Sequence, residues 1–169
     1  MATTMPWLPG WPAVLPRRRA ARAHAIPAPS GPPLARGERV LLTTDGVVAT
    51  DRACYHAAPP DSGAEWARLG WEQIVRADPY EHGLVLTAWA PGLPPRTVLT
   101  VHRAGRLLAL ARERVAATTL ITTRVFVDGE PARVTARRRP GTGEILWLVA
   151  GASPTPATLA RLRATYFGG

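Results

Sequence analysis

The sequence predicts an α+β fold: an antiparallel sheet of the barrel or sandwich type is followed by a helix and by a C-terminal βββα extension. Three observations predict it. Short runs rich in β-branched and aromatic residues alternate with turn signals over residues 38–102. Apolar residues then recur at helical spacing over residues 105–118. Further strand-like runs and a second helical segment follow. The number of strands, about six or seven before the first helix, is typical of a barrel or sandwich.

The first predicted strands form a tight hairpin, around which the rest of the sheet is arranged. Residues 38–44 are the first strand, closed by the turn signal Asp45-Gly46. Residues 46–56 are predicted to form two strands joined at residues 50–53, where the Asp51 carboxylate can bond nearby backbone amides. An isolated hairpin is marginally stable in water, so it needs a third strand and a cover for its apolar face.

The segments after the hairpin supply the further strands and the cover for its apolar face. Residues 66–75 are a further extended segment with large side chains, and residues 84–89 and 97–102 form an antiparallel pair after a turn at 78–83. The helix predicted over residues 105–118 carries one apolar stripe. This stripe is made of Leu107, Leu108, Ala111 and Val115.

These residues also resemble a known family. Residues 45–55, with Thr50-Asp51 at the hairpin turn and Tyr55 after it, and residues 69–74, with Trp71 three positions before Ile74, are similar to PH-like domains of the bacterial PH and GRAM-like group. More closely, they resemble a family of small actinobacterial proteins with this layout. The resemblance covers residues 38–118. It implies a bent sheet plugged by one C-terminal helix and a scaffold for docking proteins or anionic lipids, and it supplies no catalytic residue.

The chain beyond residue 118 departs from the PH-like layout. Strands are predicted over residues 120–127, 132–137 and 145–149, with a hairpin turn at Asp128-Gly129. A second helix follows, with Ser153 or Thr155 as its N-cap. This extension could continue the first sheet or form a second layer, and it leaves open which helix is the plug.

Residues 1–37 are predicted to be a disordered, proline-rich basic tail, and residues 38–169 a single PH-like domain with its extension. Aromatic residues beside an arginine cluster are typical of an interfacial membrane anchor. The candidate anchor comprises Trp7, Trp11, Arg17, Arg18, Arg19 and Arg22. The alternatives are a solvated leader and a misassigned start codon, with Met5 as the other start.

Charge and composition narrow the class of partner. The formal net charge is +9, which favours anionic partners, but every one of the 21 basic residues is arginine, as codon bias in a GC-rich genome also produces. The single cysteine, Cys54, excludes an internal disulfide and is expected in the core. No apolar run is long enough to span a bilayer and no secretory signal is recognised, so we expect a cytoplasmic protein, with peripheral membrane contact as an alternative.

The sequence offers no enzymatic constellation. The glycines of residues 141–143 are too few for a phosphate-binding loop, and the four histidines lack metal-ligand spacing. We therefore expect neither catalytic residues nor a cofactor or metal. The tryptophans on predicted strands are expected in the core, which does not favour RNA recognition.

Arginines on one predicted strand are the candidate anion-binding or partner-binding site. Alternation along the strand places Arg133, Arg137 and Arg139 on one face and Arg138 on the other. The alternative is a solvated face that protects a strand edge. The expected function is a non-enzymatic interaction module with a protein partner. An anionic membrane bound through the tail and a nucleic acid bound through the arginines are the alternatives.

Overall fold

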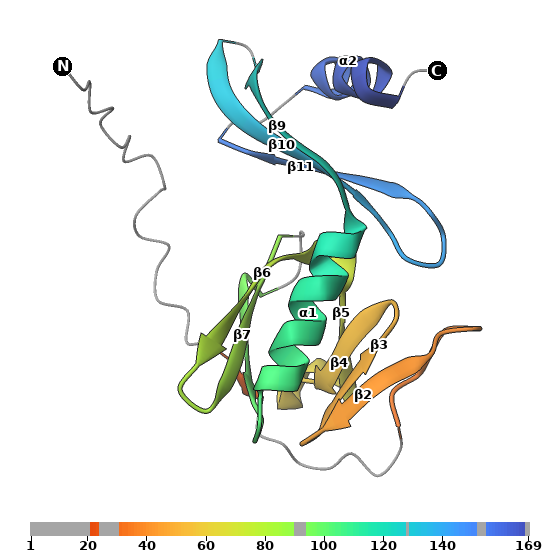
Figure 1. Cartoon of the computed structure of the whole chain (residues 1–169), viewed down its shortest axis with the longest axis vertical. Helices are drawn as coiled ribbons and strands as arrows, with labels where there is room; N and C mark the ends of the chain where they lie inside the picture. The colour runs from red at the N-terminus through yellow and green to blue at the C-terminus, as the bar shows by residue number, and fades with distance from the viewer. Residues whose placement is uncertain (1–20, 24–30, 90–93, 128, 152–154, 168–169) are drawn as a thin grey trace, which may run out of the picture.

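The computed structural model of the chain describes residues 21–23, 31–89, 94–127, 129–151 and 155–167 (Figure 1). Within these ranges the elements follow one another in this order: β1 (Ala21–Ala23), β2 (Val40–Thr44), β3 (Val47–Thr50), β4 (Ala53–Ala57), η1 (Pro60–Ser62), β5 (Trp66–Gly70), η2 (Trp71–Gln73), β6 (Ile74–Tyr80), β7 (Gly83–Ala88), β8 (Arg96–Thr100), α1 (Gly105–Thr118), β9 (Thr119–Val127), β10 (Glu130–Arg138), β11 (Ile145–Ala150) and α2 (Pro156–Phe167).

The strands form separate sheets rather than a closed barrel. One sheet has the order β2-β3-β4-β5 with antiparallel neighbours, a second has the order β1-β8-β7-β6, and a third has the order β11-β10-β9. In the second sheet β1 runs parallel to β8, and the other pairs are antiparallel. The predicted α+β class is therefore confirmed, whereas a closed barrel is not formed.

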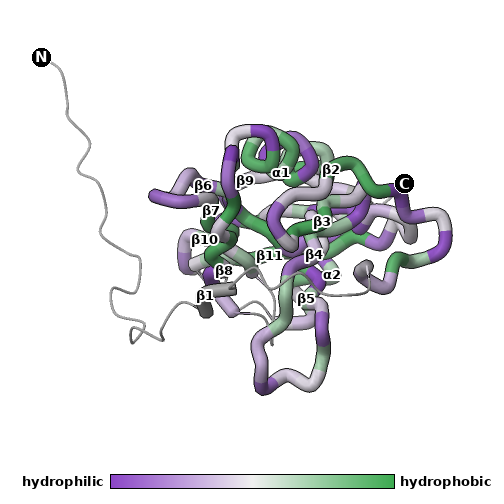
Figure 2. The backbone as a smooth tube through the Cα atoms, turned by 90° about the horizontal axis from the view of Figure 1, so that it is seen from below, coloured by the Kyte–Doolittle hydropathy of each residue, from purple (hydrophilic) through white to green (hydrophobic). Residues whose placement is uncertain are grey.

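One hydrophobic core is shared by the two four-stranded sheets and α1. Buried residues of β3, β4, β5, β6, β7, β8, η2 and α1 belong to a single cluster. Figure 2 shows hydrophobic segments running through β3, β7 and α1. Trp71 in η2 is fully buried, and its indole Nε1 donates a hydrogen bond to the Thr50 carbonyl at 2.9 Å. This tryptophan therefore ties the β3–β4 turn to the start of β6.

Helix α1 spans the predicted residues and buries the predicted stripe. Leu107 and Ala111 are buried in the shared core, and Leu108 and Val115 pack against it. The helix ends where Thr118 and Thr119 turn their hydroxyls back onto the Val115 carbonyl, after which the chain continues directly as β9. Side chains that bond backward in this way compete with the helical pattern and accompany its end.

The β3–β4 hairpin forms at the predicted position, but a different residue fixes its turn. The Thr50 hydroxyl accepts hydrogen bonds from the Arg52 and Ala53 amides at 3.1 and 2.8 Å. Asp51, which was expected to bond nearby amides, instead accepts from the distant Arg39 amide at 2.9 Å. Because threonine and aspartate both form such turns, their roles here were not separable in the sequence.

A buried carboxylate lies behind this turn. Glu38, predicted to begin the first strand, lies before β2 and accepts the Thr50 hydroxyl at 2.5 Å and the Tyr55 hydroxyl at 3.0 Å. The amide of Ala35 donates to the same carboxylate at 3.0 Å. Burial by itself raises the pKa of Glu38, but these hydrogen bonds to the ionised form outweigh it, so its pKa lies below the usual value.

The C-terminal extension forms its own three-stranded sheet, which does not continue the first sheet, and α2 follows it in the chain. The β9–β10 and β10–β11 pairs are antiparallel, with a bulge in β9 opposite residues 136–137. Thr155 caps α2, because its hydroxyl accepts the Thr158 amide at 3.2 Å. The other predicted cap, Ser153, lies outside the described residues.

Part of the predicted disordered tail is described. Residues 21–23 form β1 beside β8, and the chain is described again from residue 31, where a hydrogen bond from the Glu38 amide to the Ala35 carbonyl closes a turn. The prediction of disorder over residues 1–37 is therefore wrong for residues 21–23, which form a strand, and for the turn that begins at Ala35. Residues 1–20 and 24–30 lie outside the described part of the chain. No helix in the described ranges is long and apolar enough to cross a membrane.

We expect Glu38→Gln to lower the free energy of unfolding at pH 7 by about 1–3 kcal/mol, since a buried, fully bonded carboxylate is replaced by an amide. The lowered pKa means that the native carboxylate contributes stability above the usual value of 4.5, and that this contribution disappears as pH falls through the folded-state pKa. The difference between wild type and variant should therefore narrow in acid.

Urea denaturation followed by tryptophan fluorescence, at pH 7 and below 4.5, measures both effects. Glu81→Gln is the matched control, because Glu81 is exposed and its loss changes the net charge equally. If the difference in the free energy of unfolding between Glu38→Gln and wild type stays constant with pH, the ionised Glu38 carboxylate does not stabilise the fold in this way.

Candidate functional site

The end of β10 is anchored to the N-terminal core by a buried arginine. Arg137 is only 5% exposed, and its Nη1 donates to the Trp71 carbonyl at 3.4 Å and to the Ile74 carbonyl. These carbonyls belong to the first residue of η2 and the first residue of β6, where the chain passes from β5 to β6. The guanidinium group therefore bonds the end of β10 to the backbone of this junction.

Glu72 is the buried acid at this junction. Its side chain is 1% exposed, and its Oε1 accepts from Arg139 Nε at 3.1 Å. Arg139 also contacts the exposed Glu144 at 2.5 Å. Burial lowers the pKa of Arg137, and the nearby negative charge of Glu72 opposes that shift. Glu72 thus interacts with two arginines, Arg137 at the end of β10 and Arg139 just after it.

Close backbone packing surrounds this carboxylate. A Cβ atom at Gly70 would lie 2.5 Å from both carboxylate oxygens of Glu72, so glycine leaves the room that the acid occupies. The Gln73 side chain caps η2 by accepting the Gly70 amide at 2.9 Å. In the loop after β10, Gly141 has φ +90° and its α-carbon faces the Arg52 guanidinium. Residues 140–142 form a turn between β10 and β11, and not a phosphate-binding loop.

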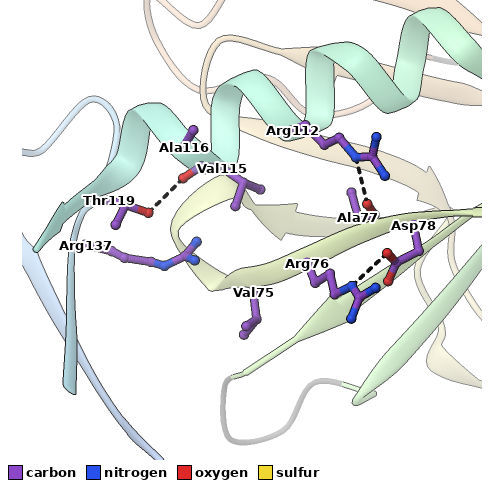
Figure 3. Close-up of a pocket in the computed structure, with 9 residues that line it drawn as sticks. All are labelled: Val75, Arg76, Ala77, Asp78, Arg112, Val115, Ala116, Thr119 and Arg137. Atoms are coloured by element: carbon purple, nitrogen blue, oxygen red, sulfur yellow. Dashed lines mark hydrogen bonds and ion pairs between the residues drawn. The ribbon is translucent and has the colours of Figure 1, made fainter. Parts of the chain in front are cut away.

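An open hollow of about 450 Å³ lies between β6, α1 and the start of the C-terminal sheet (Figure 3). Its lining includes three arginines, Arg76, Arg112 and Arg137, and one acid, Asp78. The remaining lining is largely apolar and consists of Val75, Ala77, Val115, Ala116 and Thr119. Charged groups against apolar walls are the composition expected of a site for a polar ligand.

The three guanidinium groups are held in different ways. Arg76 Nε lies 2.7 Å from the Asp78 carboxylate, and Arg112 Nε donates to the Ala77 carbonyl at 3.1 Å. Each contact is made by the Nε atom of its guanidinium group. The terminal nitrogens of Arg76 and Arg112 take part in no hydrogen bond among the described residues. The Nε of Arg137 is buried and has no hydrogen-bond partner within the described residues. The hollow therefore retains unused donors and an excess of positive charge.

The predicted arginine patch is only partly formed. The register of β10 against β11 does place Arg133 and Arg137 on one face, as alternation predicted. Arg133 is exposed, but the expectation that the guanidinium groups share an open surface is wrong for Arg137, because the core covers the end of the strand. Arg139 follows β10 and is held by Glu72 and Glu144.

The predicted tail anchor cannot be placed in the fold. Trp7, Trp11 and the cluster Arg17, Arg18 and Arg19 lie outside the described residues. The backbone of Arg22 belongs to β1 and pairs with Val98. The anchor therefore remains a prediction from the sequence.

Sequence reasoning missed Arg76, Arg112 and Glu72. A signal existed for Glu72, since an acid between Trp71 and Ile74 interrupts a run of core residues and requires a buried cation. For Arg112 the helical spacing predicted only a polar face of α1. Its contact with Ala77 of β6 joins residues 35 positions apart, so the spacing within the helix could not predict it.

Other candidate chemical groups have structural roles. Burial raises the pKa of the Cys54 thiol to about 12, so it remains protonated as the predicted core residue. His56 is buried and its pKa is lowered by that burial. Within the described residues no group of three or more histidine, cysteine, aspartate or glutamate side chains is placed to hold a metal ion. Of the tryptophans expected in the core, Trp71 is fully buried whereas Trp89 is 46% exposed.

Comparison with protein-family models, with curated proteins and with solved structures finds no match to this chain.

Replacing Arg139 with alanine should lower the free energy of unfolding by about 1–3 kcal/mol, because the buried Glu72 carboxylate loses its hydrogen-bonded cation. The side chain of Arg139 is itself 38% exposed, which lets water compensate in part. The double variant Glu72→Gln/Arg139→Ala should recover part of the loss, since no buried charge is then left unpaired.

Chemical denaturation measures each variant. Arg138→Ala is the matched control, because Arg138 is the exposed neighbour at the end of β10 and its loss removes the same charge. Equal destabilisation by Arg138→Ala and Arg139→Ala would show that the pair with Glu72 is not what anchors the strand.

Proposed function

We propose that this protein is a cytoplasmic, non-enzymatic docking module with a PH-like fold, which binds a phosphate-bearing group of its partner in the arginine-lined hollow. The single observation that carries the proposal is the hollow itself, whose lining brings together three arginines, Arg76, Arg112 and Arg137, and one carboxylate, Asp78. Guanidinium groups bind phosphate oxygens with paired, charge-assisted hydrogen bonds.

The order of the elements supports the PH-like part of the proposal. The chain first forms the antiparallel meander β2-β3-β4-β5, then the meander β6-β7-β8, and then α1, which packs on the core that both share. The resemblance over residues 38–118 implies this order and ends with the same helix. The C-terminal sheet and α2 are additions to that layout.

The charge balance supports an anionic ligand. Of the three arginines that line the hollow, only Arg76 is paired with an acid that also lines it. Arg112 has no acid partner among the lining residues and contributes its terminal nitrogens, and Arg137 adds positive charge at the wall of the hollow.

The walls of the hollow favour docking over catalysis. Val75 is 42% exposed at the edge of the hollow and Val115 lies beside it, which gives a partner apolar contact next to the charged groups. The lining offers guanidinium groups, one paired carboxylate and a threonine whose hydroxyl donates to the Val115 carbonyl. These groups bind and orient anions through charge-assisted hydrogen bonds, and the one carboxylate among them is held by Arg76.

Inorganic phosphate should bind with weak affinity and shift the Arg112 and Arg137 Nε–Hε resonances in a two-dimensional NMR titration of the full chain. Arg112→Ala should weaken binding by roughly tenfold, because it removes a guanidinium group that has free terminal nitrogens and no acid partner in the hollow. Arg106→Ala is the matched control, since Arg106 is exposed on the same helix and does not line the hollow.

Two further titrations distinguish a phosphorylated protein from a membrane phospholipid as the source of the phosphate. One uses a phosphoserine peptide, and the other uses vesicles containing an anionic phospholipid. Tighter binding of the peptide identifies a protein partner, and tighter binding of the vesicles identifies a membrane. If Arg106→Ala weakens phosphate binding as much as Arg112→Ala, or if neither arginine resonance moves, the hollow is not the binding site.

A further inference from the structure

Residues paired across neighbouring strands lie on the same side of a sheet. Along residues 131–136 of β10 the two sides of the C-terminal sheet differ in burial. On the buried side β10 contributes Ala132, Val134 and Ala136. On the other side Arg133 lies directly opposite Arg124 of β9, Thr135 lies opposite Thr122, and Pro131 lies opposite Phe126. We call the side made by these six residues the Arg124 face.

The Arg124 face is open to solvent. Arg124, Arg133, Thr122 and Pro131 are exposed, and Phe126 is 79% exposed, more than any other large hydrophobic residue in the described chain. The two threonine hydroxyls lie 3.3 Å apart and form a polar step beside the arginine pair. An aromatic ring this exposed contributes little to folding, since it is not removed from water.

The charge of the Arg124 face is not compensated. Like charges directly opposite each other across a β-ladder are destabilising, yet Arg124 and Arg133 form such a pair. Neither is part of an ion pair in the described residues. β9 and β11 contain no acid, and the only acid of β10, Glu130, lies next to Pro131 in the strand and thus on the opposite side. A polyanion would relieve this repulsion.

We propose that the Arg124 face binds single-stranded nucleic acid, with Arg124 and Arg133 contacting phosphates, Phe126 stacking on a base, and Thr122 and Thr135 bonding to the sugar–phosphate backbone. Proteins bind single strands through basic surfaces combined with exposed aromatic rings, because an unpaired base offers a free face for stacking. A duplex keeps its base faces covered and would use the arginines alone.

The same observations disfavour an anionic membrane as the partner. Phe126 lies close to the tip of the β9–β10 hairpin, where Glu130 is also exposed. Insertion of the tip into an anionic bilayer would bring this carboxylate against negatively charged headgroups. A nucleic-acid strand that lies along the sheet would contact only the Arg124 face. Glu130 is on the other side of the sheet, and β9, β10 and β11 contribute no acid to the Arg124 face.

This inference is independent of the docking proposal. The Arg124 face uses Arg124, Arg133 and Phe126, whereas the hollow uses Arg76, Arg112 and the buried Arg137. Loss of binding at one site therefore leaves the other intact, and the two sets of variants separate them.

Fluorescence anisotropy of the full chain with a labelled, mixed-sequence single-stranded oligonucleotide of about 12 nucleotides tests the proposal. Binding should be measurable at low salt and weaken steeply as salt increases. The double variant Arg124→Ala/Arg133→Ala should lose at least roughly tenfold in affinity and lower the salt slope by about 1.4, which corresponds to two released phosphate contacts. Phe126→Ala should lose roughly fivefold to a hundredfold in affinity, as expected for one lost base stack.

The double variant Arg161→Ala/Arg163→Ala is the matched control. Both residues are exposed on α2, so the same charge is removed away from the Arg124 face, and affinity should stay within about twofold of wild type. Every changed side chain is exposed, and equal thermal midpoints confirm that each variant is folded.

Four results would overturn the inference: no binding at low salt, an equal loss in the α2 control, a duplex of the same sequence that competes as well as the single strand, or unchanged affinity in Phe126→Ala. Co-sedimentation with anionic vesicles that depends on Phe126, without oligonucleotide binding, would assign the face to a membrane instead.

Discussion

A single buried carboxylate, that of Glu72, determines how the two parts of the chain are joined. An ionised acid in a protein interior is unfavourable unless a hydrogen-bonded cation accompanies it. Arg139 supplies that cation, and Arg137 lies close enough for its charge to interact with the acid. Both arginines belong to the end of β10 or the loop after it, so their interactions with Glu72 bring the end of β10 close to η2. The hollow beside α1 lies at this junction, and Arg137 is one of the residues that line it.

Glu38 has the equivalent role at the other end of the first sheet. It lies before β2, yet it accepts hydrogen bonds from Thr50 and Tyr55 across the β3–β4 hairpin. The tyrosine hydroxyl in turn accepts Arg68 Nε at 3.2 Å, and the guanidinium carbon lies 5.9 Å from the tyrosine ring centre. Buried acids thus fix the geometry of this protein twice, each by binding donors that are remote in sequence.

Some arginines of this basic chain are bonded within the fold, and others have no acid partner and can bind an anionic ligand. Arg137 and Arg139 hold strands together, and Arg39, Arg76 and Arg114 are each paired with a neighbouring acid. Arg124 and Arg133 have no acid partner within the described residues, and Arg112 is bonded only to a backbone carbonyl. Codon bias explains why so many basic residues are arginine, but not why particular ones remain uncompensated. These are the positions where we expect anionic partners to bind.

The sequence alone determined the local elements: the hairpin turn at residues 50–53, the bounds of α1 and the three C-terminal strands with their helix. Turn residues and the periodicity of apolar side chains depend on neighbours in the chain, so they can be recognised without a fold. It also determined that Arg133 and Arg137 share a face, because alternation is a local property of a strand. Only the tertiary structure decided that Arg137 is buried, that Arg139 pairs with Glu72, and that Arg112 lines a hollow with β6. Each of these depends on which distant segment covers a given face, and that choice is made by packing between sheets.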